Sequence, residues 1–271
     1  KEIIMSYDQK ISRVKPGLIG LVLDDSGSMA DKLPGTSDPK YQWVERYVGI
    51  IFDELLSRSS DVKGNMPVIK PRYYLYVLKY GSDTELWGNG EMDIEAAVEL
   101  FSNSGNSLGL GGHMGGTDSE KALQQMHDYL TQALAGERFK DSFPPMVLHL
   151  TDGESWTDAT GHAEQIKQLS TNDGNVLMVN AYIGTQTSLS YAGPEDFPGY
   201  VDLSEAGPGE DNVRLLNMSS EAPECILDNL KADNIFPKIR SNSRLFFDVR
   251  TKETLKHTLQ VVGSMGSRMA R

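Results

Sequence analysis

The sequence has few of the features that mark secreted, membrane-spanning or disulfide-stabilised proteins. Its 271 residues include a single cysteine, Cys225, which excludes an intrachain disulfide framework and a zinc site built from several cysteines. No apolar stretch approaches the roughly 18–20 residues that a transmembrane helix needs. Residues 1–5 form too short and too charged a run for a signal peptide. We therefore expect a cytoplasmic protein.

Basic residues are also scarce. Lysine and arginine total 26, against 38 aspartates and glutamates, so the formal net charge is −12. A protein with this charge offers no basic surface to a nucleic-acid backbone, and an anionic membrane repels it. We therefore expect neither a nucleic-acid partner nor a membrane partner.

The acidity is concentrated in one part of the chain. Residues 185–235 contain ten acidic side chains but only two basic ones, Arg214 and Lys231, and so carry about two thirds of the net charge. Glycine- and proline-rich turns interrupt this stretch. The pattern predicts a long, acidic, irregular excursion over residues 185–243, with one short helix near residues 221–232.

Elsewhere, short apolar runs alternate with amphipathic helices. The runs have almost no polar alternation, which is typical of strands that are covered on both faces of a parallel sheet. They predict a single doubly wound (Rossmann-like) α/β domain over residues 1–271, with helices on both faces and one antiparallel edge strand from a hairpin at residues 73–87. The predicted strands are 18–23, 73–78, 146–150, 176–183 and 245–249, and the predicted helices include 44–55, 93–101, 123–134, 159–169 and 252–262.

Oxygen-bearing side chains follow two of the predicted strands, where an open α/β sheet binds its ligands. Asp24, Ser26 and Ser28 alternate along the tip after the first strand, so all three can point to one side. Asp152 follows the strand at 146–150, and a glycine-rich loop delivers Thr117 just before a helix. Such an oxygen-only set suits a hard divalent cation. The alternative is that these residues have only structural roles, as helix N-caps and turn residues.

These residues carry a resemblance to a known family. The pattern Asp24-x-Ser26-x-Ser28, with Thr117 and Asp152 supplied later, resembles the metal-ion-dependent adhesion site (MIDAS) of von Willebrand factor A domains. The resemblance implies Mg²⁺, with Mn²⁺ and Ca²⁺ as alternatives. It implies direct ligation by the three hydroxyls and ligation through water by the two carboxylates. It also implies a protein partner whose Asp or Glu takes an open coordination position.

The resemblance extends along most of the chain. Residues 245–249 and the helix after them resemble the family's last strand and helix. Residues 5–13 and 215–220 are similar to bacterial stand-alone members, including those associated with tellurium resistance and stress response. This implies a non-catalytic interaction module, with an adaptor role in such a system as one setting.

An enzyme is the competing hypothesis. A strand followed by Asp24-Asp25 is also found in phosphotransferases of the haloacid dehalogenase type, in which a second Asp two positions later handles the leaving group. Here that position is Ser26, and an unperturbed hydroxyl is a poor general acid at neutral pH.

The histidines do not have the spacing of paired metal ligands. His149 lies in an apolar run and is predicted to be a hydrogen-bonded core residue.

Overall fold

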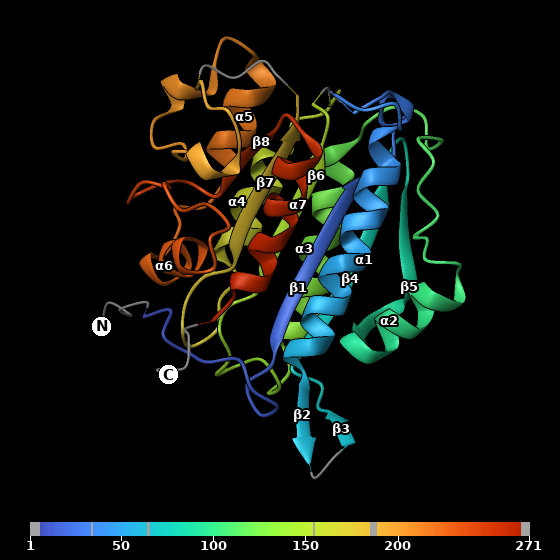
Figure 1. Cartoon of the computed structure of the whole chain (residues 1–271), viewed down its shortest axis with the longest axis vertical. Helices are drawn as coiled ribbons and strands as arrows, with labels where there is room; N and C mark the ends of the chain where they lie inside the picture. Colours follow the sequence, from blue (N-terminus) through green and yellow to red (C-terminus); the bar gives the residue numbers. More distant parts are fainter. Residues whose placement is uncertain (1–5, 34, 64–65, 154, 185–188, 267–271) are drawn as a thin grey trace.

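The computed structural model describes residues 6–33, 35–63, 66–153, 155–184 and 189–266 (Figure 1). Met5 and Thr185, which begin two of the segments discussed above, lie outside these ranges. The centre of the fold is a six-stranded sheet in the order β5-β4-β1-β6-β7-β8, parallel except for the antiparallel pair β4 and β5. Its strands are β1 (Gly17–Asp24), β4 (Tyr73–Tyr80), β5 (Thr84–Asp93), β6 (Met146–Thr151), β7 (Leu177–Ile183) and β8 (Phe246–Val249).

The predicted fold class is therefore confirmed. Every residue of β1, β6 and β7 is buried, because helices cover the sheet on both faces. β5 is the antiparallel edge strand, and only Trp87 and Met92 in it are buried, which reflects that position. The predicted hairpin accounts for this edge, although β5 runs on to Asp93, beyond the predicted end at residue 87.

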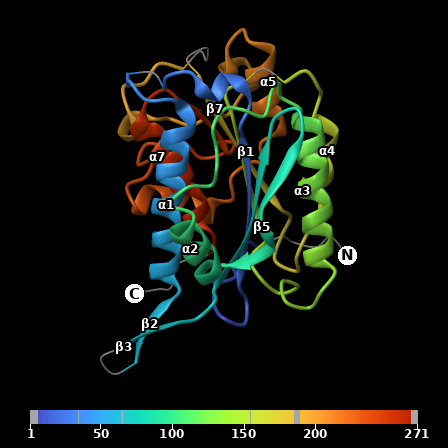
Figure 2. The same ribbon diagram turned by 90° about the vertical axis from the view of Figure 1, so that its right-hand side faces the viewer.

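Helices form a layer on each side of the sheet (Figure 2). One layer contains α1 (Lys40–Arg58), α2 (Ile94–Asn103) and α7 (Lys252–Gln260). The other contains α3 (Ser119–Leu134), α4 (Thr160–Gln168) and α5 (Glu210–Met218). The stripe predicted for α1 is buried as expected, and side-chain caps fix the starts of α2 and α3, where Asp93 accepts from Ala96 N and Asp118 accepts from Lys121 N.

The acidic segment has more structure than the sequence indicates. It forms two short 3₁₀ turns, the unpredicted helix α5, and the predicted helix α6 (Glu224–Ala232). Phe197 packs against Phe236 and Phe247, with ring centroids 4.9 and 5.6 Å away, so the segment has apolar anchors on the core. α5 is nine residues long and follows a glycine- and proline-rich run, so its pattern is too short to stand out in the sequence.

A second, two-stranded sheet follows the C-terminal end of α1. β2 (Ser60–Lys63) and β3 (Met66–Ile69) pair antiparallel, and these two strands are additional to those predicted from the sequence. Ion pairs from Lys70 and Arg72 to Asp61 hold the base of this hairpin. Within the described ranges, no helix is both long and apolar enough to cross a membrane.

The parallel strands all end at the upper edge of the sheet in Figure 1. The tips after β1 and β6 and the start of α3 meet at this edge, and α5 lies at the same end of the molecule (Figure 1). The topology therefore gathers the predicted site residues from three separate parts of the chain.

Candidate metal centre

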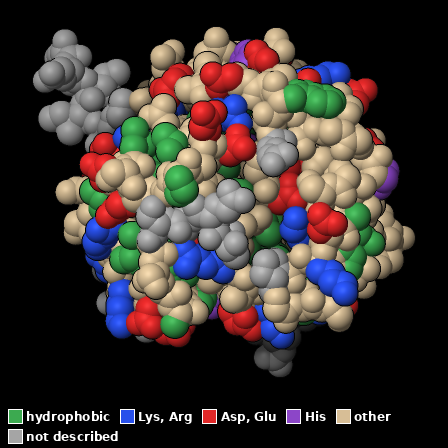
Figure 3. Space-filling view, turned by 90° about the horizontal axis from the view of Figure 1, so that it is seen from above, with side chains coloured by type: hydrophobic (Ala, Val, Ile, Leu, Met, Phe, Trp, Pro, Cys, Tyr) green, Lys and Arg blue, Asp and Glu red, His purple; other side chains and the backbone are tan. Residues whose placement is uncertain are grey.

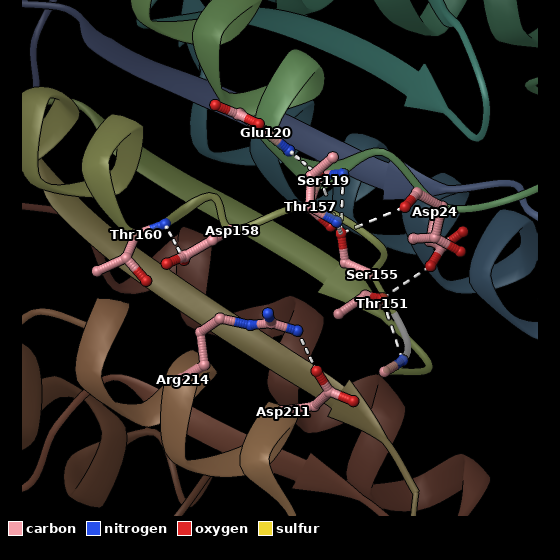
Figure 4. Close-up of polar contacts among 12 residues, drawn as sticks. Asp24, Ser119, Glu120, Thr151, Ser155, Thr157, Asp158, Thr160, Asp211 and Arg214 are labelled. Atoms are coloured by element: carbon pink, nitrogen blue, oxygen red, sulfur yellow. Dashed lines mark hydrogen bonds and ion pairs between the residues drawn. The ribbon is translucent and has the colours of Figure 1, made fainter.

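Asp24 is fixed at the end of β1 by its neighbours. The register that pairs Leu23 with Leu150 brings the next residues of the two strands together, and Thr151 Oγ1 donates to Asp24 Oδ2 at 2.7 Å (Figure 4). The other carboxylate oxygen, Oδ1, accepts from the backbone N–H of Ser26 at 2.8 Å. Asp24 is fully buried. Its carboxylate is thus held in one orientation beneath the loop that carries the two serines.

Three of the other predicted residues form a connected chain of oxygens. Ser26 Oγ lies 3.2 Å from Ser28 Oγ, and Ser28 Oγ donates to Asp152 Oδ1 at 2.8 Å. The alternating spacing of Ser26 and Ser28 does put both hydroxyls on one side of the tip, as the sequence predicts. The tips after β1 and β6 are therefore joined through side chains of the candidate site.

Thr117 faces the same site across a small pocket. The pocket encloses about 410 Å³, and Thr117 lines it together with Ser26 and Ser28. Gly27 N–H donates to Gly115 O at 2.8 Å and so ties the glycine-rich loop to the β1 tip. All five predicted residues, Asp24, Ser26, Ser28, Thr117 and Asp152, thus lie at one edge of the sheet.

Two carboxylates that the sequence did not single out as site residues, the buried Asp25 and the half-buried Glu45, hold the glycine-rich loop in place. Asp25 Oδ1 accepts from the N–H groups of Gly111 and Gly112 at 2.7 and 2.6 Å, and Asp25 O accepts from Met114 N at 3.0 Å. Glu45 of α1 accepts from Leu108 N and from Leu110 N, at 2.9 Å each. These hydrogen bonds fix the backbone of the loop that carries Thr117. The only sequence signal for Asp25 was its place beside Asp24.

The loop after β6 forms the other wall of the pocket. Ser155 Oγ and the backbone N–H of Trp156 both donate to Thr117 O at 3.2 Å, and Thr157 Oγ1 donates to the Asp118 carboxylate at 3.0 Å. Figure 4 shows Ser155 and Thr157 facing the first turn of α3. The Trp156 ring lies over Gly116, where a side chain would come within 2.3 Å of a ring carbon. Trp156 is nevertheless 65% exposed.

A lysine also enters the site, and no sequence signal indicated it. Lys40, the first residue of α1, places Nζ 2.8 Å from Asp152 Oδ2 and 3.2 Å from Ser28 O. The Lys40 side chain is 13% exposed and the Asp152 side chain 4%. Asp152 is therefore bonded on both oxygens, to a hydroxyl through Oδ1 and to an ammonium through Oδ2.

The site carries more negative charge than its protein surroundings neutralise. Burial, followed by the nearby charge of Asp152, raises the pKa of Asp24 to about 6. Among the described residues, no group of three or more His, Cys, Asp and Glu side chains is placed to hold a metal, so a metal here depends on hydroxyls as well as carboxylates. The hydroxyls of Ser26, Ser28 and Thr117 line one pocket, and the carboxylates of Asp24 and Asp152 accept hydrogen bonds from the two serines. Such a set of oxygens is a fitting donor set for a hard divalent cation.

A second group of buried polar side chains crosses the sheet nearby. His149 Nε2 lies 2.7 Å from the Tyr80 hydroxyl, and His149 Nδ1 lies 2.9 Å from Asn180 Oδ1. Asn180 Nδ2 donates to Ser219 Oγ at 3.0 Å, and that hydroxyl donates to Leu215 O. Burial lowers the pKa of His149 to about 4, so the imidazole is neutral. The prediction of a hydrogen-bonded core histidine is confirmed.

The molecular surface at this end has no dominant sign of charge. Seen from above, acidic and basic side chains are interspersed over the described part of the face, and hydrophobic side chains form small separate patches (Figure 3). Part of the acidity of residues 189–243 is paired, since Arg240 bonds Glu205 and Lys238 bonds Asp196. The uneven charge in the sequence is thus moderated by ion pairs within the same segment.

The sequence matches no known protein family and no curated protein. In structure the chain is similar to proximal thread matrix protein 1 from the mussel byssus, with a TM-score of 0.51 and 14% identity, over 92% of this chain and 47% of that one. The same byssus protein with a zinc-occupied MIDAS motif gives a TM-score of 0.50 and 13% identity over the same shares. A mutant of the PilB minor pilin from Streptococcus sanguinis gives a TM-score of 0.53 and 8% identity, over 91% of this chain and 60% of that one.

The chain spans about half the length of the byssus protein. At such low identity the likeness concerns the fold alone. Together with the strand order and the antiparallel edge, it gives this chain the fold of a von Willebrand factor A-like domain.

Proposed function

We propose that this chain is a non-catalytic protein-interaction module that binds Mg²⁺ and captures an acidic residue of a partner protein. Ser26, Ser28 and Thr117 would hold the cation directly, and Asp24 and Asp152 would hold it through water. The bound cation would supply an electrophilic position for the partner's carboxylate. The observation that supports this most is the connected set of hydroxyls and carboxylates directly above the buried Asp24.

Charge favours a cation at this place. Asp24 is buried, and its pKa is raised because burial, and then the nearby charge of Asp152, disfavour its ionised form. Neutral hydroxyl ligands would leave much of the charge of a divalent cation uncompensated, so an incoming Asp or Glu is attracted. The zinc-occupied MIDAS motif of the similar byssus protein supports a divalent metal in this fold. Mn²⁺ and Ca²⁺ are alternatives, because both also accept oxygen ligands.

The pocket beside Thr117 gives the partner a place to dock. Gly27, Gly115 and Gly116 line it without side chains, so another chain can approach the backbone closely. Trp156 stands at its wall, largely exposed and fixed by the backbone bond to Thr117. Exposed aromatic side chains of this kind are common anchors of interfaces. We therefore propose that the partner covers Trp156 while its carboxylate reaches the metal.

The acidic segment is proposed as a second, partner-selective side of the same docking face within a single domain of residues 1–271. Gly209, Asp211 and Asn212 line a pocket of about 290 Å³ together with Lys40 and Asp152 of the site. The segment thus lies against the candidate centre. An adaptor role in a bacterial stress-response or metal-resistance system is the setting that the sequence resemblance favours.

The enzyme hypothesis finds less support. In a phosphotransferase of the haloacid dehalogenase type, Asp24 would be the nucleophile, but it is fully buried and both of its oxygens accept hydrogen bonds. Ser26 occupies the place of the acid that such an enzyme needs for its leaving group. The enzyme would require turnover of a phosphate ester that Asp24→Asn abolishes.

The experiment is a pull-down from native lysate with the full chain as bait, in Mg²⁺ and in EDTA. We expect specific partners that are lost in EDTA and lost again with Ser26→Ala. Ser37→Ala is the matched control, because this exposed hydroxyl lies outside the site and bonds only its neighbour Asp38 among the described contacts. Capture that is the same with and without EDTA would contradict the proposal.

A further inference from the structure

The metal-binding function does not explain why a lysine, Lys40, lies at the site. Its ammonium lies against Asp152 Oδ2 at 2.8 Å and also donates to Ser28 O at 3.2 Å. It thereby takes one oxygen of a carboxylate that is otherwise available to a cation. The side chain is largely buried, so solvent screens this contact only weakly.

The backbone holds Lys40 in this position. The segment between the β1 tip and α1 folds back on itself, because Asp31 N–H donates to Ser28 O at 3.0 Å and Lys40 N–H donates to Asp31 O at 2.9 Å. Lys32 and Pro39 form an isolated antiparallel bridge within the same turn. α1 then begins at Lys40, directly beside Ser28. These backbone contacts therefore fix the start of α1, and with it Lys40, beside Ser28.

We propose that Lys40 is a built-in counter-charge that sets the affinity of the site for divalent cations by competing with them for Asp152. The proposal rests on the proposed metal-binding function. In the metal-free protein the ammonium neutralises Asp152, which would otherwise add a second buried negative charge close to Asp24. A divalent cation that binds beside Ser28 must then either share Asp152 with a like charge or displace the ammonium.

The structure also provides a place for a displaced ammonium. Lys40 and Asp152 line the pocket of about 290 Å³ that continues to the first turn of α5, where Asp211 is another lining residue. Asp211 itself pairs with Arg214 (Figure 4). An ammonium displaced from Asp152 would stay in this pocket, which the Asp211–Arg214 pair borders, so the proposed exchange leaves it near a carboxylate.

The test is a calorimetric titration of Mn²⁺ into wild type, Lys40→Met, Lys40→Arg and Lys140→Met. We expect Lys40→Met to bind Mn²⁺ about tenfold more tightly, because removal of a like charge a few ångströms away strengthens the site. Lys40→Arg keeps the charge and should stay near the wild-type affinity. Lys140→Met removes the same charge from an exposed residue near the opposite end of the sheet and should have no effect.

A second neutral variant keeps the test decisive if Lys40→Met does not fold. Lys40→Gln removes the charge but keeps a donor for Asp152, and it should also tighten Mn²⁺ binding and enlarge the rise in melting temperature that Mn²⁺ causes. If wild type binds Mn²⁺ and both neutral variants bind it equally or more weakly, Lys40 is not a competing counter-charge. If none of the five proteins binds Mn²⁺, Mg²⁺ or Ca²⁺, the metal-binding function itself is wrong.

Discussion

Two groups of buried polar side chains lie in the same sheet, and they differ in how completely their charges and hydrogen bonds are matched. The group around His149 is neutral and pairs its members in sequence, from Tyr80 through Asn180 to Ser219. The group around Asp24 contains two carboxylates and one ammonium, and the pKa of Asp24 is raised. The first group has the character of a structural core, and the second that of a binding site.

The difference between the His149 group and the Asp24 group indicates which of the two is expected to bind a ligand. Buried polar groups stabilise a protein when all are paired, and an unmatched buried charge destabilises it. A site that gives up stability in its free form can regain it when a ligand supplies the missing charge. The difference between the two groups therefore predicts opposite responses to mutation and to pH.

The largest effect is expected from His149→Leu. The change leaves the Tyr80 hydroxyl and the Asn180 side chain without their central partner in a fully buried place, so the free energy of unfolding should fall by about 3 kcal/mol. Urea unfolding in EDTA measures it. Mn²⁺ affinity of the folded variant should stay within about twofold of wild type, since His149 lies outside the donor set. A selective loss of metal binding would place His149 in the site.

The pH dependence of the free energy of unfolding tests the burial of the neutral His149 imidazole. Burial holds the pKa of His149 at about 4, below the value of 6.5 for an unfolded chain, so the unfolded state binds a proton first as the pH falls. This histidine therefore contributes stability above pH 6.5 that is lost on acidification to pH 4, up to about 3 kcal/mol. Urea unfolding from pH 7 to pH 4 should show this loss in wild type and a smaller one in His149→Gln. Equal pH profiles would contradict the assignment.

Asp24→Asn should act in the opposite direction. The raised pKa means that the ionised carboxylate destabilises the metal-free fold above about pH 6. Replacement by the neutral amide should stabilise the protein in EDTA at pH 7.5 by about 1–2 kcal/mol, after the loss of one hydrogen bond is allowed for. The gain should shrink toward pH 5, as wild-type Asp24 takes up a proton. A destabilised variant at pH 7.5 would show that the Asp24 charge is already matched without metal.

The smallest effect on stability is expected from Trp156→Ala. The ring is 65% exposed, so unfolding free energy should change by less than about 0.5 kcal/mol, and Mn²⁺ affinity should not change. Binding of the partner captured in the pull-down should weaken at least tenfold, because an exposed aromatic anchor is lost. Val14→Ala is a control, since this exposed apolar residue precedes β1 and lies far from the strand tips. Equal loss of binding in both variants would remove Trp156 from the docking face.

Much of the sheet, and the gathering of the five proposed site residues at one edge of it, follow from local sequence. Strands covered on both faces appear as apolar runs, and the polar residues at their tips stand out against them, as Asp24 and Asp152 do. Lys40, Asp25 and Trp156 have no such local pattern. Their roles depend on contacts that the folded chain creates, such as the return of the segment before α1 to Ser28.

The acidic segment shows the same limit on a larger scale. Its composition indicates a solvated loop, and Phe197 and Phe236 give little sign in the sequence that they anchor the segment on β8. Helix α5 is stabilised by packing against β7 and α4, and its intrinsic pattern is short. Composition alone therefore underestimates structure where a few aromatic residues make distant contacts.

The most direct test of the metal site is a calorimetric titration of Mg²⁺ and Mn²⁺ into wild type, Ser26→Ala and Thr117→Val, with Ser37→Ala as control. The two site changes remove a hydroxyl without altering charge, so the fold and its net charge stay the same. We predict binding at one site in wild type and Ser37→Ala, and a loss of at least tenfold in affinity in Ser26→Ala and Thr117→Val. Unchanged affinity in both site variants, with the fold retained by circular dichroism, would contradict the assignment of the metal to these hydroxyls.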